Sequence, residues 1–488
     1  MPPSSRPLGQ GGEDITISTQ WFEAAVRASH VQSVLTREIP ELASGELTLL
    51  DCAIKRLRSA EPEGYWTASY MLTLAGASFG TGRTVAARGV LIPPGAPTPE
   101  PYAAQRLGAE TWRCFLPELR LDLSIDGGGD AALPAVELLR DPPQSRRLLE
   151  SVLRTANADW RDVALSGVAP EVIDYKPGAR CTILCHLEYS DVSATDPRCP
   201  EVVVAKVHAD DAGVQIYRYM RALWESRFGR SRHVSMARPL GYVTELHMLV
   251  QSAVPEEQTL KALFQSAVLN GSRVTMRELE EALRRTARGL ADLHHSGLSE
   301  GPVVSWSDEL VTLRAKRDKL AAVVPRLTDL DASVFDRMAA ADVTTSSHVM
   351  VPVHHSFRPS QVLLAGTSMS FIDFDKSCRS EPESDLAMLT TKLRHMSLNK
   401  VQLTGEADED DEVLDDGTRR ARIGQADRLC EVFVSEYERC APLNARRLAL
   451  WEALELFSLI LSAAKKSNPG RVENCVFMFD EHLRVRGL

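Results

Sequence analysis

Three short stretches carry residues whose types and order could support chemistry on a phosphate. Lys206 stands near the end of the apolar run "VVVAKV", and "HHSFRPSQVLL" (354–364) precedes "SFIDFDKSCRSEPESDLA" (370–387). Phosphoryl transfer needs a cation on the phosphates, oxygen ligands for a divalent metal ion and a group that orients the acceptor hydroxyl. Asp373 and Asp375 lie two apart in a predicted strand. Alternate side chains of a strand share one side, so both carboxylates are placed to hold a metal ion.

The second and third stretches resemble two motifs of the aminoglycoside phosphotransferase and choline kinase family. Members of that family have a loop of the form H-G-D-x-H-x-x-N, or a variant that ends in Gln, followed by a strand of the form I-D-W or I-D-F. "HHSFRPSQ" is similar in register, from His354 in the first position to Gln361 in the eighth. The following strand has Asp373 in the place of the metal ligand, and Asp385 as the anchor at the start of a helix. The resemblance extends over 170–488.

This resemblance implies ATP and Mg²⁺ as ligands. "LVQSAV" (249–254) is similar to the hinge strand that receives adenine, and "RGLADLHHSGL" (288–298) is similar to the helix before the catalytic loop. The residues implied at the nucleotide are Lys206, Gln251 and Val254. The metal ligands implied are Asp373, Gln361 and Asp375. The catalytic-loop positions are His354, His355 and Ser356.

The departures from the family pattern that bear on the chemistry concern the base, the helix glutamate and Gln361. Ser356 stands where the catalytic Asp is expected, and a serine hydroxyl does not accept a proton at neutral pH. Loss of such a general base removes roughly 10²–10⁴ of the rate. The helix predicted over 214–225 should supply a glutamate to Lys206, but its first turns offer only Gln215. Gln361 in place of Asn is the mildest change, because its amide oxygen still suits magnesium.

Two neighbours could replace the missing base. His355 is adjacent and could take a proton directly, whereas Asp375 could act through a water molecule. His354 is expected to be a packed loop histidine that bonds to the backbone. Consecutive residues of an extended chain point opposite ways, so the two histidines are a poor metal pair. Ser356 lacks the G-x-S-x-G turn of acyl-transfer nucleophiles, which excludes that chemistry.

The composition is that of an ordinary globular protein and excludes several classes. The 488 residues carry a net charge of -10, and the pI is about 5.7. A general nucleic-acid binder would have a basic surplus instead. The nine cysteines include no CxxC pair and are expected to be reduced thiols. No apolar run is long enough to span a membrane, and the first residues do not form a signal peptide. We therefore expect a cytoplasmic protein with no membrane or nucleic-acid partner.

The order of predicted elements indicates an α+β, bilobal, protein-kinase-like fold with an extra N-terminal region that contains β-strands. "YKPGAR" (175–180) between apolar runs predicts a hairpin. "GASFGTGRT" (76–84) has an arginine where a phosphate-binding loop has its lysine, so it too predicts a hairpin turn. A capping box at Thr275 and Glu278 predicts the start of a long helix. The predicted regions are a disordered start at 1–14, an N-terminal α/β region at 15–165, a β-rich lobe at 166–253, and a helical lobe at 254–488 with a solvated acidic loop at 405–417. The hinge between the lobes is expected near 250–256.

The N-terminal region shows a weak internal similarity to the β-rich lobe. "TGRTVAARGVLIPPG" (81–95) aligns with "CPEVVVAKVHADDAG" (199–213), which sets Arg88 opposite Lys206. One interpretation is a second lobe-like unit in the N-terminal region. Chance similarity between two hairpins explains the alignment equally well.

Three functions remain open. The first is a pseudokinase that binds Mg-ATP, transfers phosphate weakly or not at all because Ser356 replaces the base, and acts through a protein partner or a conformational switch. The second is an active small-molecule O-phosphotransferase with a displaced base, acting on a hydroxyl-bearing substrate or transferring another part of the nucleotide. The third is a scaffold that binds no nucleotide. Lys206 and Asp373 favour the first over the third, and Ser356 counts against the second.

Overall fold

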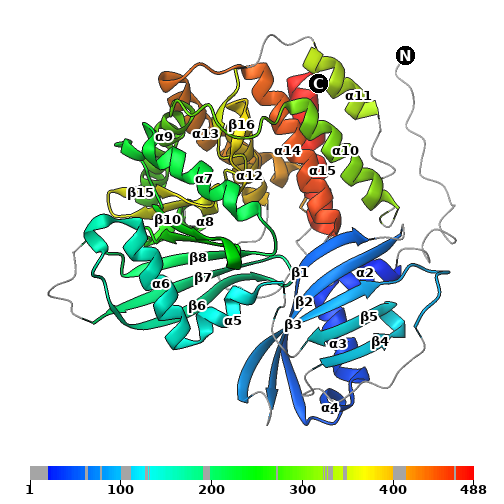
Figure 1. Ribbon diagram of the computed structural model, residues 1–488. Helices are drawn as coiled ribbons and strands as arrows, with labels where there is room; N and C mark the ends of the chain where they lie inside the picture. The colour runs from blue at the N-terminus through cyan, green and yellow to red at the C-terminus, as the bar shows by residue number, and fades with distance from the viewer. Residues whose placement is uncertain are drawn as a thin grey trace, which may run out of the picture. The chain divides into compact units, whose positions relative to one another are not determined.

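The structure is a computed structural model that describes residues 20–60, 64–76, 80–99, 111–126, 130, 132–190, 198–270, 273–322, 324, 327, 333–343, 349–398, 414–465 and 469–487. The chain divides into two compact units (Figure 1). Unit 1 consists of Met1–Gly128, Ala315–Ala332 and Leu461–Asn468. Unit 2 consists of Gly129–Arg314, Ser333–Ile460 and Pro469–Leu488. The predicted disorder at 1–14 lies outside the described residues.

Unit 1 is built around an antiparallel five-stranded sheet preceded by helices. The helices are α2 (Gln20–Val26), α3 (Ala28–Glu38) and α4 (Pro40–Ala43), and the strands are β1 (Leu47–Ala60), β2 (Tyr65–Gly76), β3 (Gly80–Leu91), β4 (Thr111–Leu116) and β5 (Leu121–Asp126). The buried Tyr70 hydroxyl donates to the carbonyl of Ala25 at 2.9 Å, which ties α2 to the sheet. Gly76 pairs with Gly80 across β2 and β3, so the predicted hairpin at 76–84 is confirmed.

The β-rich lobe of unit 2 has a second antiparallel sheet of five strands. Helices α5 (Pro134–Arg140) and α6 (Pro142–Ala156) precede β6 (Leu165–Lys176), β7 (Arg180–Tyr189), β8 (Val202–His208), β10 (Pro239–Val243) and β11 (Met248–Ser252), and α7 (Ala212–Glu225) follows β8. Cys181, Ile183 and Val207 are buried in one apolar core with residues of α6. Because side chains alternate along a strand, the residues between them face the other side. The hairpin predicted at "YKPGAR" is confirmed by the pairing of β6 with β7.

The two sheets share their strand order and one uncommon hairpin. With the strands of each sheet numbered along the chain, both follow the order first, second, third, fifth, fourth. In each sheet a 3₁₀ turn joins the fourth strand to the fifth. That turn ends in a non-glycine residue in the left-handed region, Arg120 in unit 1 and His247 in unit 2, both with φ of 46°. The same local backbone geometry therefore occurs at the same place in both sheets.

The strand pairing also fixes which positions correspond between the sheets. The first residue of the fifth strand pairs with Leu91 in unit 1 and with Val207 in unit 2. One residue earlier, Val90 corresponds to Lys206. The sequence alignment that sets Arg88 opposite Lys206 is therefore wrong by two residues, because it matched letters without knowing the register. Unit 1 has an apolar side chain where unit 2 has its lysine.

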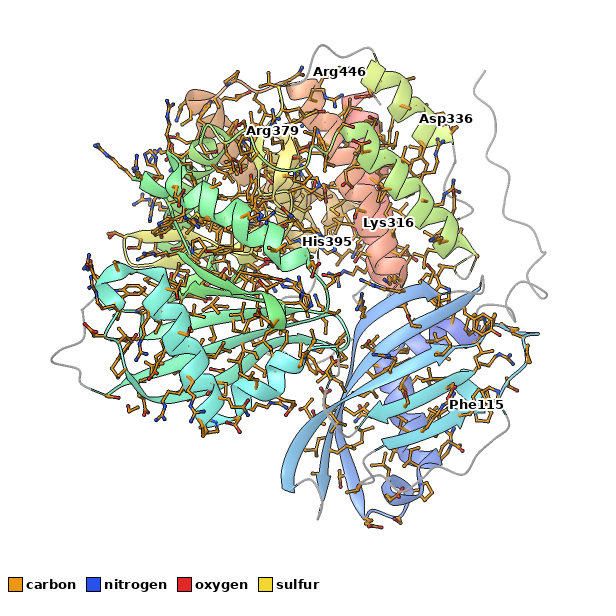
Figure 2. The ribbon with its side chains drawn as sticks, in the orientation of Figure 1. Phe115, Lys316, Asp336, Arg379, His395 and Arg446 are labelled. Atoms are coloured by element: carbon orange, nitrogen blue, oxygen red, sulfur yellow. The ribbon has the colours of Figure 1, made fainter. Side chains whose placement is uncertain are left out.

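The second lobe of unit 2 is mostly helical. Its helices are α8 (Leu260–Asn270), α9 (Arg273–His294), α10 (Trp306–Ala321), α11 (Ser333–Val343), α12 (Glu383–Leu398), α13 (Asp416–Cys440), α14 (Ala445–Lys465) and α15 (Pro469–Arg486), with the last residues of α10 and α14 belonging to unit 1. Trp451 and His395 are buried, and Figure 2 labels His395 within this lobe. Because α9 begins at Arg273, the start predicted at Thr275 is wrong. Of the predicted acidic loop at 405–417, the part up to 413 lies outside the described residues. Its end opens α13.

Short strands hold the two motif segments side by side. β9 (Ser235–Met236), β12 (Gln258–Thr259), β14 (Val362–Ala365) and β15 (Ser368–Phe371) form one sheet, and β13 (Val351–Val353) pairs with β16 (Cys378–Ser380) in another. The catalytic-loop segment lies between β13 and β14, and the segment after β15 leads into β16. These pairings bring the ends of both segments to one place.

The predicted α+β architecture, with a β-rich lobe, a helical lobe and extra β-containing sequence before them, is confirmed. All nine cysteines lie in described segments and are free thiols. Within the described ranges, no helix has both the length and the apolar character that crossing a membrane requires.

Candidate functional site

Lys206 joins the two lobes of unit 2. Its side chain, 10% exposed, leaves β8 on the face opposite the apolar core, and its Nζ donates to Asp373 Oδ1 at 2.8 Å and to Asp375 Oδ1 at 2.6 Å. Burial alone would lower the pKa of Lys206, but the two carboxylates outweigh it and raise that pKa. The lysine is therefore a fixed positive charge.

Asp373 and Asp375 reach Lys206 in a way that differs from the prediction. We expected both on one strand, but β15 ends at Phe371, and Asp373 has a left-handed backbone with φ of 71°. A 3₁₀ turn, Phe374–Lys376, follows it. This sharp turn, and not strand alternation, brings the two carboxylates to the same lysine. Asp375 thereby supplies the carboxylate partner that α7 lacks.

Gln361 lies beside Asp373, with its nitrogen toward the carboxylate. Its Nε2 donates to Asp373 Oδ2 at 3.0 Å, and its Oε1 accepts from the backbone N–H of Arg358 at 3.0 Å. The amide oxygen thus caps the 3₁₀ turn Pro359–Gln361. To serve as a metal ligand, the Gln361 amide has to rotate so that its oxygen replaces its nitrogen.

In the catalytic-loop segment, His354 is fully buried and Ser356 is nearly so. His354 Nε2 donates to the carbonyl of Ile372 at 2.8 Å, so in the neutral imidazole Nδ1 carries the lone pair and accepts from the Ser356 hydroxyl at 3.2 Å. The imidazole also packs against the rings of Phe357 and Phe374. The expectation that His354 bonds to the backbone is confirmed. The hydroxyl of Ser356, which replaces the base, thus lies within hydrogen-bond distance of His354 Nδ1.

His355 is unsuited to the role of a substitute base. Its Nε2 lies 3.2 Å from Glu309 Oε1, and its backbone is left-handed, with φ of 59°. Burial would lower its pKa, but contacts with Cys378 and Glu309 outweigh burial and raise the pKa to about 10. His355 is therefore protonated at neutral pH and has no lone pair to offer. The contact with Glu309 and the raised pKa thus make His355 a poor candidate for taking the acceptor's proton.

Asp385 holds the catalytic-loop segment in place. Its fully buried carboxylate accepts the backbone N–H groups of His354 and His355, each at 2.7 Å, and lies 3.2 Å from His294 Nε2. Burial alone would raise the pKa of Asp385, but the contact with His294 helps to lower it. Asp385 lies in the first turn of α12, as the resemblance implied for the anchor at the start of a helix.

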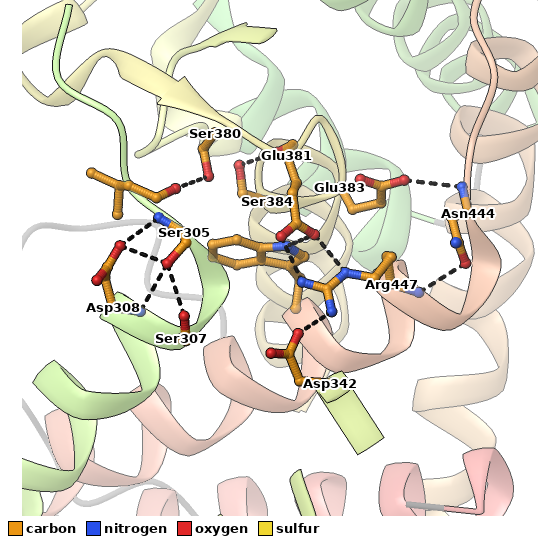
Figure 3. Close-up of polar contacts among 12 residues, drawn as sticks. Ser305, Ser307, Asp308, Asp342, Ser380, Glu381, Glu383, Ser384, Asn444 and Arg447 are labelled. Carbon is orange, nitrogen blue, oxygen red and sulfur yellow. Dashed lines mark hydrogen bonds and ion pairs between the residues drawn. The ribbon is translucent and has the colours of Figure 1, made fainter. Parts of the chain in front are cut away.

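The start of α12 is fixed in turn by a buried ion pair (Figure 3). Arg447 donates to both carboxylate oxygens of Glu381, at 2.6 and 2.5 Å, and also contacts Asp342. Trp451 Nε1 adds a hydrogen bond to Glu381 at 2.9 Å. Because Glu381 comes just before α12, this network positions the helix that carries Asp385.

Gln251 lies in β11 beside the predicted hinge. It is directly opposite Val204 of β8 and is 4% exposed. Its side-chain Oε1 is buried and has no hydrogen-bond partner among the described residues. Val254, three residues on, is half-buried in the connection to the helical lobe.

Residues 194–427 match the model of the phosphotransferase enzyme family. The chain carries a phosphotransferase-family domain. Among similar solved structures, a glucosamine kinase is 14% identical with a TM-score of 0.47, covering 93% of this chain and 100% of that one. A choline/ethanolamine kinase family protein from Mesorhizobium loti is 15% identical, with a TM-score of 0.41, covering 70% and 98%. A thermostable mutant of aminoglycoside phosphotransferase APH(4)-Ia, in ternary complex with ADP and hygromycin B, is 13% identical, with a TM-score of 0.42, covering 70% and 97%.

The TM-scores lie below 0.5, so the assignment rests on the family model and not on these structures. A search of curated proteins gives no match. With the family model, the bilobal phosphotransferase architecture is assigned to the part of the chain that carries Lys206 and the two motif segments.

The oxygen donors of this phosphotransferase domain fit a magnesium ion brought in with phosphates. Asp373 is 34% exposed, so its carboxylate is accessible, and Asp375 contacts the same lysine nitrogen. Carboxylate oxygens supplemented by phosphate oxygens are the ligands Mg²⁺ prefers. Burial would raise the pKa of Asp373, but Lys206 outweighs burial and holds that pKa well below its usual range. The Asp373 carboxylate is thus ionised at any ordinary pH.

Sequence reasoning missed three residues of unit 2 that lie at this site or support it. Arg180 Nη1 lies 3.6 Å from Asp375, Glu309 contacts His355, and Asp130 accepts from the turn before Arg180. Arg180 could have been found by strand alternation from Lys206, as the register of β7 and β8 places both on one face. Glu309 and Asp130 lie far from the motifs in sequence and carry no signal of their own.

Proposed function

We propose that the phosphotransferase-family domain binds Mg-ATP between its two lobes and transfers the terminal phosphoryl group weakly or not at all. The observation that carries this proposal is the meeting of Lys206 with Asp373 and Asp375. A lysine for the phosphates comes from the β-rich lobe, and carboxylates for a metal ion come from the helical lobe. Holding a triphosphate with its metal ion requires these groups at one point.

The base of the nucleotide has a candidate partner in Gln251. A buried amide oxygen without a hydrogen bond costs free energy, so the position favours a ligand that donates to it. The exocyclic amino group of adenine is such a donor. The adjoining backbone at Val254 is the second element that we assign to the adenine.

Magnesium bound with the phosphates would neutralise their charge and fix their geometry. Asp373 is the residue we assign as its ligand, with Asp375 and the Gln361 oxygen as further candidates. Lys206 would neutralise further charge on the phosphates.

Weak transfer follows from the residue at the place of the base. Ser356 donates its proton to His354 and has no negative charge with which to accept the acceptor's proton. Such a protein acts by changing conformation, or by recruiting a protein partner, when the nucleotide binds.

A second candidate function is favoured by the same contact. His354 Nδ1 stands directly behind the Ser356 hydroxyl, at 3.2 Å. In an active small-molecule O-phosphotransferase, the acceptor's proton could pass to Ser356 while the Ser356 proton passes to His354. The acceptor oxygen would then bond to the terminal phosphorus as the bond to the nucleoside diphosphate breaks.

Thermal melts with ATP, with and without magnesium, test the first function. At about 100 times its dissociation constant, a ligand of the folded state adds roughly 2.7 kcal/mol to stability. We expect a magnesium-dependent rise in midpoint that Asp373→Ala loses and that the control Asp336→Ala, on the exposed face of α11, keeps. No rise in the wild type would contradict nucleotide binding. Turnover of ATP that is lost in Ser356→Ala would favour the second function.

A further inference from the structure

The face of the β-rich sheet that carries Lys206 also carries a second cation. Arg180 is directly opposite His208 in the pairing of β7 with β8, and Thr182 is directly opposite Lys206. Residues that face each other across an antiparallel pair share a face, as do residues two apart on a strand. Arg180 and Lys206 therefore project from the same side of the sheet, toward Asp375.

The turn that precedes Arg180 is held from outside. One oxygen of Asp130 accepts the backbone N–H of Gly178 at 2.6 Å and the hydroxyl of Tyr175 at 3.0 Å. Gly178 has φ of 65°, a conformation that glycine adopts without strain. The base of the Arg180 side chain is thus fixed by a glycine turn and by contacts with the half-buried Asp130 carboxylate. Such a fixed loop positions a cation without a large loss of entropy on binding.

Arg180 makes only loose contacts of its own. Its Nη1 lies 3.6 Å from Asp375 Oδ2, and its Nη2 lies 3.5 Å from Asp174 Oδ2. Its Nε is buried and finds no hydrogen-bond acceptor among the described residues. Lys206, by contrast, contacts its carboxylates at hydrogen-bond distance. A guanidinium has five N–H donors in a planar fork, and this one has donors left to give.

Asp375 is the only described side chain that the ion pairs link to both cations. One of its oxygens bonds to Lys206 and the other faces Arg180. A phosphate group offers more charge and more oxygens in a geometry that suits a guanidinium fork. We infer that Arg180 is a second phosphate ligand beside Lys206, and that Asp375 is the counter-ion that the phosphates of a nucleoside di- or triphosphate displace. This inference rests on the proposed function, since it assigns a residue to the same nucleotide.

Arg180→Gln tests it, with direct binding titrations of Mg-ADP and of adenosine. We expect Mg-ADP to bind roughly tenfold or more weakly, because a charge-assisted hydrogen bond contributes at least about that factor. Adenosine, which has no phosphate, should bind as to the wild type. Arg221→Gln is the matched control, since Arg221 is 62% exposed and pairs with Glu225 on α7. It should change neither affinity.

Titration of Asp375→Asn with ADP in the absence of magnesium tests whether Asp375 is a displaced counter-ion or a metal ligand. Removing the competing carboxylate should tighten magnesium-free ADP binding. Equal or weaker binding would overturn the role given to Asp375.

The outcomes distinguish this inference from the proposed function. If the wild type binds no Mg-ADP, the proposed function fails and this assignment with it. If the wild type binds and Arg180→Gln binds equally well, only the assignment of Arg180 fails. If the variant loses adenosine and Mg-ADP to the same extent, Arg180 has a structural role and the assignment is likewise wrong.

Discussion

Asp385→Asn should destabilise the catalytic-loop segment through the loss of one acceptor. Each carboxylate oxygen of Asp385 now accepts one backbone N–H, from His354 and from His355, at 2.7 Å. A carboxamide is nearly the same size but has a single acceptor oxygen. Its NH₂ group would therefore face a backbone N–H, donor against donor, in a fully buried place.

The magnitude follows from these contacts. A hydrogen bond to a charged group contributes about 1.5–3 kcal/mol, and a buried donor left without a partner costs about 1–3 kcal/mol more. The sum is about 2.5–6 kcal/mol, a large share of the roughly 5–15 kcal/mol typical of folded domains. The left-handed backbone of His355 makes recovery harder, because that strained conformation is held by the lost contact. The thermal midpoint should fall by roughly 5–15 °C.

Urea and thermal unfolding at neutral pH measure this loss. The matched control is Asp336→Asn, because Asp336 is 75% exposed and pairs only at the surface with Arg314. An exposed pair of this kind should contribute less than about 1 kcal/mol. A loss below about 1 kcal/mol for Asp385→Asn would refute the reasoning. The pKa of Asp385 is lowered on folding, so its contribution is present above about pH 4 and is lost as the solution is acidified further.

Three further perturbations test the surroundings of the site. Arg447→Met should lower the free energy of unfolding by about 3–5 kcal/mol, because it leaves the buried Glu381 carboxylate without its cation. In urea unfolding, the double variant that also carries Glu381→Gln should recover much of this loss. His355 has a folded-state pKa of about 10, above its unfolded value of about 6.5. Its contribution is thus fully present below about pH 6.5 and is lost as the pH rises through 10. Urea unfolding at a series of pH values should show a smaller alkaline loss in Glu309→Gln. Ser356→Asp restores a carboxylate at the place of the base, and ATP turnover should rise by roughly 10²–10⁴.

Contrary outcomes are as definite. Arg447→Met within 1 kcal/mol of the wild type would mean that Glu381 finds another partner. An unchanged alkaline loss in Glu309→Gln would remove Glu309 as a cause of the raised pKa of His355. The control for turnover is Ser360→Asp, since Ser360 is exposed in the 3₁₀ turn that follows Ser356. Equal turnover in the two aspartate variants would show that the place of Ser356 is not special.

The sequence could bring Lys206 and Asp373 together in prediction, although they lie 167 positions apart. The resemblance to the phosphotransferase family implies that both residues serve one phosphate site, and a common site requires that they meet. What the sequence could not give is the path of the chain between Asp373 and Asp375. A left-handed aspartate after a strand depends on tertiary contacts, and without it alternation seemed the natural geometry.

The roles of the two loop histidines show the same limit. Both are imidazoles next to a missing base, and nothing in "HHS" says which one keeps a lone pair. The distinction comes from Ile372 and Glu309, which reach the loop from elsewhere in the chain. The residue types predicted that both histidines lie at the site. Only the fold shows which ring nitrogens carry protons.

The two sheets of identical strand order present the chain with a folding problem. Each third strand could pair with either of the two fifth strands. Each fifth strand follows the same kind of turn, and that turn ends in a left-handed residue, Arg120 or His247. Repeated modules in one polypeptide are prone to misassembly by exchange of such elements. The side chains must then act as the discriminator, with Val90 in one third strand and Lys206 in the other. Exchange of the fifth strands between the sheets would separate the charged Lys206 from Asp373 and Asp375. Lys206, the residue proposed to serve the nucleotide, thus also disfavours pairing of its strand with the fifth strand of the other sheet.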